Sequence, residues 1–140
     1  MLNIMLTANT IYACNSRFFK NFGLSPEQYN VLRILRGNHP ETCTVVYIQE
    51  RMLDKMSNAS RLIDKLESKK LVERTQSNTD RRQVKIKITN EGIELLKAID
   101  VPFSKMESQI KCIPEDELVH FNEMLDAMRN GYRDSCEITS

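Results

Sequence analysis

The sequence contains few of the residues and motifs that enzymes use. Only four of its 140 residues are glycine, and they form neither a glycine-rich loop that cradles a phosphate nor the G-x-S-x-G turn that presents a catalytic serine. The two histidines, His39 and His120, are isolated from each other in the chain. We therefore expect a protein that is not an enzyme and that needs no cofactor.

Cysteines are also few and scattered. Cys14, Cys43, Cys112 and Cys136 occur singly, without a C-x-x-C pair or a nearby pair of histidines. This pattern excludes the usual zinc sites and the dense disulfide framework of small secreted proteins. We expect four reduced thiols and no bound metal.

Long apolar runs are absent as well. No stretch approaches the 18 or more apolar residues that span a bilayer. The N-terminus also lacks the basic region, apolar stretch and small-residue cleavage site that follow one another in a secretory signal. We expect a cytoplasmic protein without a membrane partner. With 41% apolar residues, residues 1–140 are long enough for one hydrophobic core and too short for two ordinary domains, which predicts a single domain.

The charge is unevenly distributed along the chain. The formal net charge is +1, but residues 57–89 contain nine Lys or Arg and four Asp or Glu, whereas the remainder contains eleven against fifteen. The net charge is therefore +5 in this segment and −4 in the rest of the sequence. Such a basic region is typical of a nucleic-acid-binding surface, because affinity for duplex DNA depends largely on neutralising phosphates.

The basic segment changes its hydrophobic period part-way along. Ala59, Leu62, Ile63 and Leu66 recur at helical spacing, and polar residues occupy the opposite face of that helix. Residues 84–88 alternate apolar and polar as a half-buried strand does, and residues 71–75 are suited to be its partner. Residues 76–83 between them are polar and contain adjacent arginines. Helix, strand, basic tip and strand together predict a winged helix.

Two helices are predicted before this segment. Ser25, Pro26 and Glu27 form a helix start, with a cap, a proline at the first position and an acid in the first turn. A short helix over residues 44–53 follows, and a tight turn then leads into the helix that starts at Ser57. This is the helix-turn-helix plan, in which the second helix enters the major groove. We assign residues 25–92 to the DNA-binding region.

The flanking segments, residues 1–24 and 93–140, are predicted to be apolar helices. Met5, Ala8, Tyr12 and Phe19 share a stripe in the first segment, and Leu118, Phe121, Leu125 and Met128 share one in the last. Pro102 predicts a kink or a break in the helix that follows the wing. Because the winged helix has its own core, we expect the flanking helices to form the dimerisation layer of a homodimer. The alternative is that the first helix packs on its own core.

The motifs in this order resemble the MarR (multiple antibiotic resistance regulator) family. They are MSNASRLIDKLE at 56–67, LVER at 71–74, DRR at 80–82 and IKITNEG at 86–92. The resemblance implies a mainly α fold with a small β-hairpin, in which a winged helix-turn-helix is flanked by N- and C-terminal dimerisation helices. One departure is Lys70, where such sequences usually have glycine. A non-glycine residue in a left-handed helix cap costs about 1 kcal/mol, so this helix end is expected to differ locally.

The resemblance also implies a function. We expect a dimeric transcriptional regulator, more often a repressor in this family, that binds a palindromic double-stranded DNA operator and is released by a small-molecule effector. Effectors in the family often bind between the dimer layer and the winged helix. That placement makes Tyr12, Phe19 and Tyr29 candidate pocket residues, although each also suits the core.

Several residues are predicted to contact DNA. On the recognition helix they are Ser57, Asn58, Ser60, Arg61 and Lys65, with Arg61 the candidate for a bidentate contact to guanine and Ser57 a candidate helix cap as well. At the wing tip Arg81 and Arg82 are candidates for the minor groove. The family pattern pairs the acid at Asp80 with an arginine, so we expect Arg82 to brace it and Arg81 to touch DNA.

Two alternatives remain open. The winged helix could serve as a protein-interaction module without specific DNA binding. The chain could also be a redox-sensing regulator, since some MarR-like proteins sense peroxides through a cysteine in the first helix. Aligning Tyr12 and Ala13 with the tyrosine-alanine step of those sensors places their reactive cysteine near Ala8, and Cys14 has a nearby cation only in Arg17.

Overall fold

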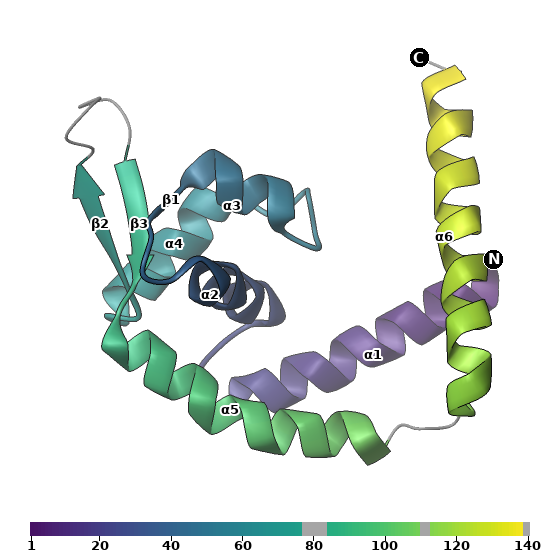
Figure 1. Ribbon diagram of the computed structural model, residues 1–140, viewed down its shortest axis with the longest axis horizontal. Coiled ribbons are helices and arrows are strands. Elements are labelled where there is room, and N and C mark those ends of the chain that lie inside the picture. Colours follow the sequence, from purple (N-terminus) through teal and green to yellow (C-terminus); the bar gives the residue numbers. More distant parts are fainter. Residues whose placement is uncertain (77–83, 110–112, 139–140) are drawn as a thin grey trace. The chain divides into compact units, whose positions relative to one another are not determined.

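The computed structural model describes residues 1–76, 84–109 and 113–138 (Figure 1). Within these residues there are six helices and a small three-stranded sheet, which confirms the expected fold class. The chain divides into two compact units, residues 1–103 and residues 104–140, and the predicted single domain stays a prediction. The elements, in chain order, are α1 (Leu2–Lys20), α2 (Pro26–Asn38), β1 (Cys43–Thr44), α3 (Val45–Arg51), α4 (Ala59–Ser68), β2 (Val72–Gln76), β3 (Val84–Ile88), α5 (Asn90–Gln109) and α6 (Glu115–Ile138).

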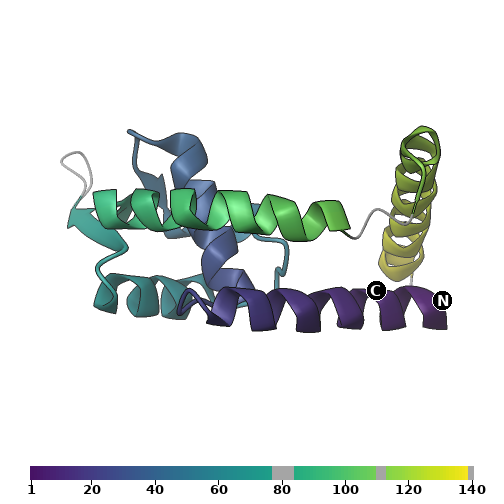
Figure 2. The same cartoon turned by 90° about the horizontal axis from the view of Figure 1, so that it is seen from below.

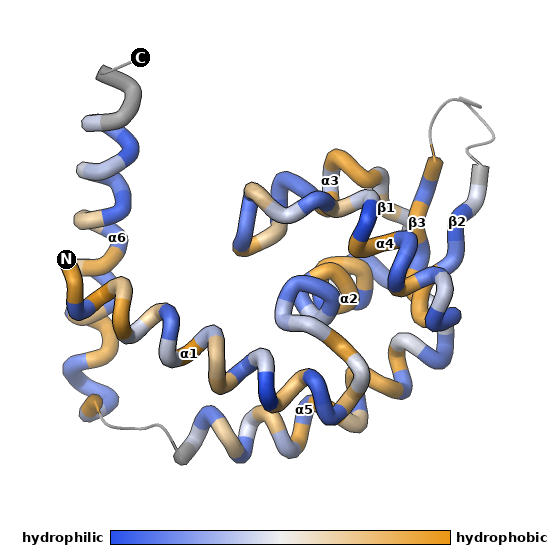
Figure 3. Tube along the Cα trace, turned by 180° about the vertical axis from the view of Figure 1, so that it is seen from behind, coloured by the Kyte–Doolittle hydropathy of each residue, from blue (hydrophilic) through white to orange (hydrophobic). Residues whose placement is uncertain are grey.

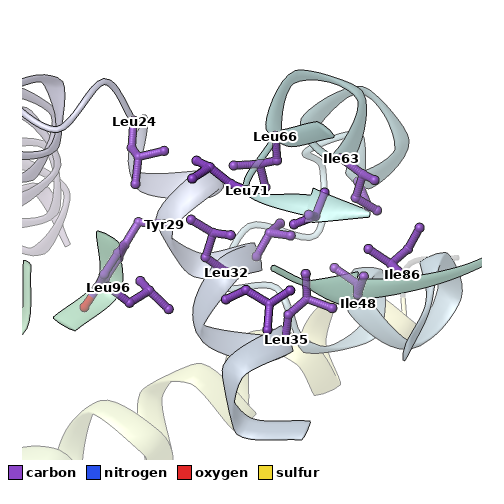
Figure 4. Close-up of a cluster of buried hydrophobic side chains, with 14 of the residues drawn as sticks. Leu24, Tyr29, Leu32, Leu35, Ile48, Ile63, Leu66, Leu71, Ile86 and Leu96 are labelled. Atoms are coloured by element: carbon purple, nitrogen blue, oxygen red, sulfur yellow. The ribbon is translucent and has the colours of Figure 1, made fainter. Parts of the chain in front are cut away.

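One hydrophobic core holds the first unit together. Figure 4 shows apolar side chains converging from α2, α3, α4, β3 and α5, among them Leu32, Ile48, Ile63, Ile86 and Leu96, which are all fully buried. Each side chain of this size contributes roughly 1.5–3 kcal/mol when it is removed from water. The inner face of α4 is therefore fixed to the core, as the helical spacing predicted.

The start of α2 follows the sequence pattern closely. Ser25 is the N-cap, its hydroxyl oxygen accepts from the Gln28 backbone N–H at 3.2 Å, and the Gln28 side chain accepts from the Ser25 N–H at 3.0 Å. This reciprocal capping box satisfies two N–H groups that a helix start leaves unpaired. In the turned view of Figure 2, α2 passes behind α5 and runs toward α1. Arg36 of α2 is bonded to Asp100 of α5 at 2.7 and 3.2 Å.

The sheet contains a strand that the sequence did not indicate. Its order is β1-β3-β2, all antiparallel, with Cys43 opposite Ile86 and Val72 opposite Ile88. At two residues β1 is too short to show an alternating pattern. Figure 3 shows the contrast between the two longer strands, since β3 is largely hydrophobic and β2 largely hydrophilic. In β2 the residues Glu73, Arg74 and Thr75 are exposed, whereas Ile86 and Ile88 of β3 are buried.

The end of α4 keeps the backbone geometry expected for glycine. Lys70 has a φ of +61°, in the left-handed region, so the local difference expected at this residue does not arise in the backbone. Leu71 N–H closes the turn on the Leu66 carbonyl at 3.0 Å, and Thr89 bonds to the carbonyls of both Lys70 and Leu71. These bonds compensate for the strain that a side chain carries in this conformation.

The first turn of α5 requires a glycine, Gly92, for a steric reason. The Thr89 hydroxyl caps α5 by accepting from the Gly92 N–H at 3.1 Å. A Cβ at Gly92 would lie 2.4 Å from the Leu71 carbonyl oxygen and 2.8 Å from Ile88 Cγ1. The close approach of α5 to the end of α4 therefore depends on the missing side chain.

The last two helices correct one expectation. Pro102 does not break α5, which continues as one helix to Gln109. Proline removes only one backbone donor, so the helix can continue past it, and the predicted kink stays a prediction. In α6 the three acids of the first turn lie at its N-terminus, where they suit the helix dipole. Among the described residues, every helix falls short of the combined length and hydropathy that crossing a bilayer requires.

Candidate nucleic-acid interface

The turn before α4 is held by two side chains. Gln49 of α3 donates to the carbonyls of Lys55 and Ser57 at 2.9 and 2.8 Å and accepts from the Ala59 N–H at 3.0 Å. Asp54 accepts from the Ser57 hydroxyl at 2.6 Å and from the Met56 N–H at 2.9 Å. These two hydrogen bonds, the Ser57 bond first, lower the pKa of Asp54. The turn that leads into α4 is thus fixed by hydrogen bonds to both Gln49 and Asp54. The sequence pattern did not single out Gln49.

The cap of α4 differs from the prediction. Asn58, and not Ser57, is the N-cap, and its side-chain oxygen accepts from the Arg61 N–H at 3.0 Å. The helix therefore begins at Ala59, two residues later than expected. Ser57 does not cap because its hydroxyl is already bonded to Asp54, so its proposed role toward DNA rests on its position in the turn alone.

The outer face of α4 carries two exposed cations, Arg61 and Lys65. Ala59, Ile63 and Leu66 are buried, whereas Asn58, Ser60, Arg61 and Lys65 are exposed and Ser57 is half-buried. Within the described residues, the Arg61 guanidinium and the Lys65 ammonium group have no ion-pair partner. A helix face with free donors and positive charge can bind phosphates and base edges.

The two acids of α4, Asp64 and Glu67, form ion pairs with a residue of strand β2. Arg74 of β2 forms ion pairs with Asp64 and, at 3.6 Å, with Glu67. The predicted pairing of β2 with β3 brings Arg74 opposite Ile86 and so beside α4. The link has no signal in the sequence, because it joins residues of different secondary structure whose approach depends on the tertiary fold.

Asp80, Arg81 and Arg82 lie outside the described residues, so the contact predicted for Arg81 and the brace predicted for Arg82 stay predictions. Their flanking strands are described, and on β3 Lys85 and Lys87 are half-buried. The two strands that carry the tip are therefore in place beside α4.

The three candidate pocket residues are not brought together as one group. Phe19 and Tyr29 are buried in the core and stack with ring centroids 4.2 Å apart, and Phe103 of α5 lies against both. Tyr12 is exposed, and its hydroxyl donates to Glu27 at 2.8 Å. This bond is the main reason that the pKa of Tyr12 is raised. Phe19 and Tyr29 thus serve the core, and Tyr12 links α1 to α2.

Among the described residues, the cysteines form no site with other reactive side chains. Cys14 is half-buried and accepts from Arg17 at 3.5 Å, while burial raises the pKa of the Cys43 thiol. No cluster of three or more His, Cys, Asp or Glu side chains that could hold a metal occurs among the described residues.

Known proteins resemble this chain over most of its length. The model of the MarR family matches residues 22–83. The HTH-type transcriptional regulator MhqR of Bacillus subtilis is 33% identical over 106 residues, which cover 74% of this chain and 70% of MhqR. The chain belongs to the MarR family. This membership makes it a transcriptional regulator and not an enzyme, as expected.

Solved structures agree with the fold of this MarR-family protein. The crystal structure of a MarR transcription factor from Planctomyces limnophilus is 33% identical, with a TM-score of 0.71, and the match covers 90% of this chain and 92% of that one. BpsR of Bordetella bronchiseptica, whose DNA binding is described as regulated by 6-hydroxynicotinic acid, is 22% identical with a TM-score of 0.75, and 91% of each chain is covered.

Proposed function

We propose that this MarR-family regulator is a cytoplasmic repressor that binds a palindromic operator as a homodimer and leaves it when a small molecule binds. The observation that carries the proposal is the outer face of α4, where the side chains of Arg61 and Lys65 are exposed and unpaired among the described residues. Such a face suits the major groove, in which arginine binds guanine through two hydrogen bonds.

The paired strands β2 and β3 are a second observation that supports DNA binding. β2 and β3 form an antiparallel hairpin beside α4, and Arg81 belongs to the segment that joins them. We propose that Arg81 contacts the minor groove and that Arg82 braces Asp80. Charge at such a wing adds affinity with little sequence preference, since the minor groove offers a degenerate base pattern.

A dimer is supported by apolar side chains of α1 and α6 that are exposed and lie outside the hydrophobic core. On α1 Met5 is 57% exposed and Ile11 50%, and on α6 Met124 is 50% exposed and Met128 42%. Exposed apolar side chains that recur along a helix commonly mark an interface between subunits. We propose that these helices form the dimer layer.

The effector proposal rests on Tyr12 and on a relative. In BpsR, DNA binding is regulated by a small aromatic acid, 6-hydroxynicotinic acid. In this chain Tyr12 is the one proposed pocket residue whose ring is exposed, and it joins α1 to α2. We propose that a ligand binds near Tyr12 and changes the packing of α1 against α2. Any effect of Phe19 and Tyr29 on the ligand is then indirect, because both are buried in the core.

The test is a DNA-selection experiment followed by footprinting. Duplexes recovered by the protein from a random pool should contain inverted half-sites about one helical turn, or 10 base pairs, apart. Band shifts at two salt concentrations should show tighter binding to the recovered duplex than to poly(dI-dC). Recovery of no common sequence would favour the protein-interaction alternative, and direct repeats or a single half-site would contradict the two-fold arrangement.

A further inference from the structure

The recognition helix carries two negative charges that its proposed partner should repel. Asp64 and Glu67 lie three residues apart on α4, so they project to one side of the helix. DNA presents a dense row of phosphates. Carboxylates on the same helix would lower its affinity unless something neutralises them or gives them another use.

Arg74 binds both carboxylates. Its Nη2 pairs with Asp64 and its Nε lies 3.6 Å from Glu67. About two thirds of the Arg74 side chain is covered, since 33% is exposed, while Asp64 and Glu67 are 58% and 41% exposed. One planar guanidinium therefore spans the two acids, a geometry that a lysine ammonium cannot reproduce.

The position of Arg74 turns this cluster into a link between two DNA-binding elements. Arg74 lies in the middle of β2, opposite Ile86 of β3, so it is part of the hairpin that carries the wing. Asp64 and Glu67 are part of the helix whose outer face carries Arg61 and Lys65. We infer that Arg74 is a positioning residue, which uses the two acids of α4 as anchors to set the recognition helix against the wing. This inference rests on the proposed function.

The link should affect sequence selectivity more than folding. Partly exposed ion pairs contribute little to global stability, because water screens them and ordered side chains lose entropy. Direct base contacts, in contrast, need the helix held to within a fraction of an ångström, whereas attraction to phosphates tolerates small shifts. A loosened α4 should therefore keep nonspecific affinity and lose affinity for its chosen sequence.

Removal of the acids separates this role from simple repulsion. The double variant Asp64→Asn with Glu67→Gln raises the net charge by two. If the acids only repel DNA, binding should strengthen on every duplex. If they anchor Arg74, affinity for the selected duplex should fall about tenfold while affinity for poly(dI-dC) stays the same or rises.

A matched variant controls for the charge. Glu73→Gln with Glu94→Gln adds the same two charges at exposed positions outside this cluster. We expect it to strengthen binding to both DNAs by similar factors. The inference is overturned if the Asp64 and Glu67 variant behaves like this control, with both affinities rising together.

A second pair of variants covers the case in which the first double variant does not fold. Arg74→Met and Lys87→Met each remove one positive charge from neighbouring strands of the hairpin. Arg74→Met should lower the ratio of selected to nonspecific affinity about tenfold further than Lys87→Met does, at an unchanged melting temperature. Equal ratios in the two variants would reject the positioning role.

The probe is the duplex that the wild-type protein recovers from a random pool, compared with poly(dI-dC). Failure of the proposed function appears at the first step, because the wild-type protein would then enrich no sequence. Failure of the inference about Arg74 appears only afterwards, as unchanged selectivity in variants of a protein that does enrich one.

Discussion

At the level of single residues, the outer face of α4 depends on which charges stay unpaired. Asp64 and Glu67 are engaged by Arg74, whereas Arg61 and Lys65 have no partner among the described residues. On α4, therefore, the two acids are engaged within the protein, whereas the two cations have no ion-pair partner in residues 1–76, 84–109 and 113–138.

Arg61 gives the sharpest residue-level test of base recognition. Arg61→Ala should cost about 1–3 kcal/mol on the selected duplex and much less on unrelated DNA. Arg81→Ala should weaken binding to both more evenly and lower the salt slope of log affinity by about one per subunit. Band shifts over a salt series measure both effects. An unchanged selectivity in a folded Arg61→Ala protein would contradict the role given to this face.

Gly92 tests the packing between the end of α4 and the start of α5. Gly92→Ala should lower the free energy of unfolding by about 1–3 kcal/mol, because the new methyl group overlaps the Leu71 carbonyl oxygen. Gly37→Ala in α2 is the matched control, since nothing lies within 4 Å of its Cβ position, and it should stabilise by about 0.5–1 kcal/mol. Urea denaturation measures both. A Gly92→Ala protein as stable as the Gly37→Ala protein would refute the steric account.

At the level of elements, the entry to α4 depends on its cap. Asn58→Ala should cost about 1 kcal/mol of stability, because the Arg61 N–H loses its acceptor. Ser57→Ala should cost less, since the Ser57 hydroxyl bonds to the exposed Asp54 and not to the helix. Thermal melts of the two variants in parallel decide between the caps, and a larger loss in Ser57→Ala would restore the cap first expected from the sequence.

The link between α1 and α2 should depend on pH. Burial raises the pKa of Glu27, but hydrogen bonds from Ser25 and Tyr12 outweigh it and lower the pKa overall. Because the folded pKa is below the unfolded one, the stabilisation is present above the unfolded value of about 4.3 and is lost as the pH falls through the folded value.

Tyr12→Phe removes one of these donors. It should lower the free energy of unfolding at pH 7 by less than about 1 kcal/mol, since the pair is largely exposed, and the difference from wild type should shrink toward pH 3. Tyr132→Phe, on an exposed tyrosine of α6, should show no such dependence. Denaturation at pH 3, 5 and 7 is the measurement, and a constant difference for Tyr12→Phe would dismiss the bond as a stabilising one.

At the level of the whole molecule, assembly follows from the apolar surface that α1 and α6 leave exposed. We expect light scattering at micromolar concentration to give twice the chain mass of 16.3 kDa. Substitution of Met128 by lysine, on the α6 stripe, should shift the protein toward the monomer and weaken operator binding in parallel, because two half-sites need two recognition helices. A monomeric mass for the wild-type protein would remove the basis for a palindrome.

Much of this protein was determined by local patterns in its sequence. The spacing of Ala59, Ile63 and Leu66 placed the recognition helix, alternation around Ile86 placed the strand, and Ser25 with Pro26 marked the start of α2. These signals are local because a helix or strand must put its apolar residues on one face and satisfy its first N–H groups nearby. The compound motif from residue 56 to residue 92 indicated the family, which the comparisons confirm.

Other features were decided only by the tertiary structure. The strand at Cys43 exists because β3 offers it a free edge, Arg74 reaches Asp64 because the hairpin packs on α4, and Gly92 is required because α5 passes close to Leu71. Each involves residues distant in sequence or different in secondary structure, so no periodicity in one segment records it. At Lys70 the tertiary structure overrides a local preference. A lysine disfavours the left-handed backbone, but the hydrogen bond from Thr89 to the Lys70 carbonyl compensates for the strain.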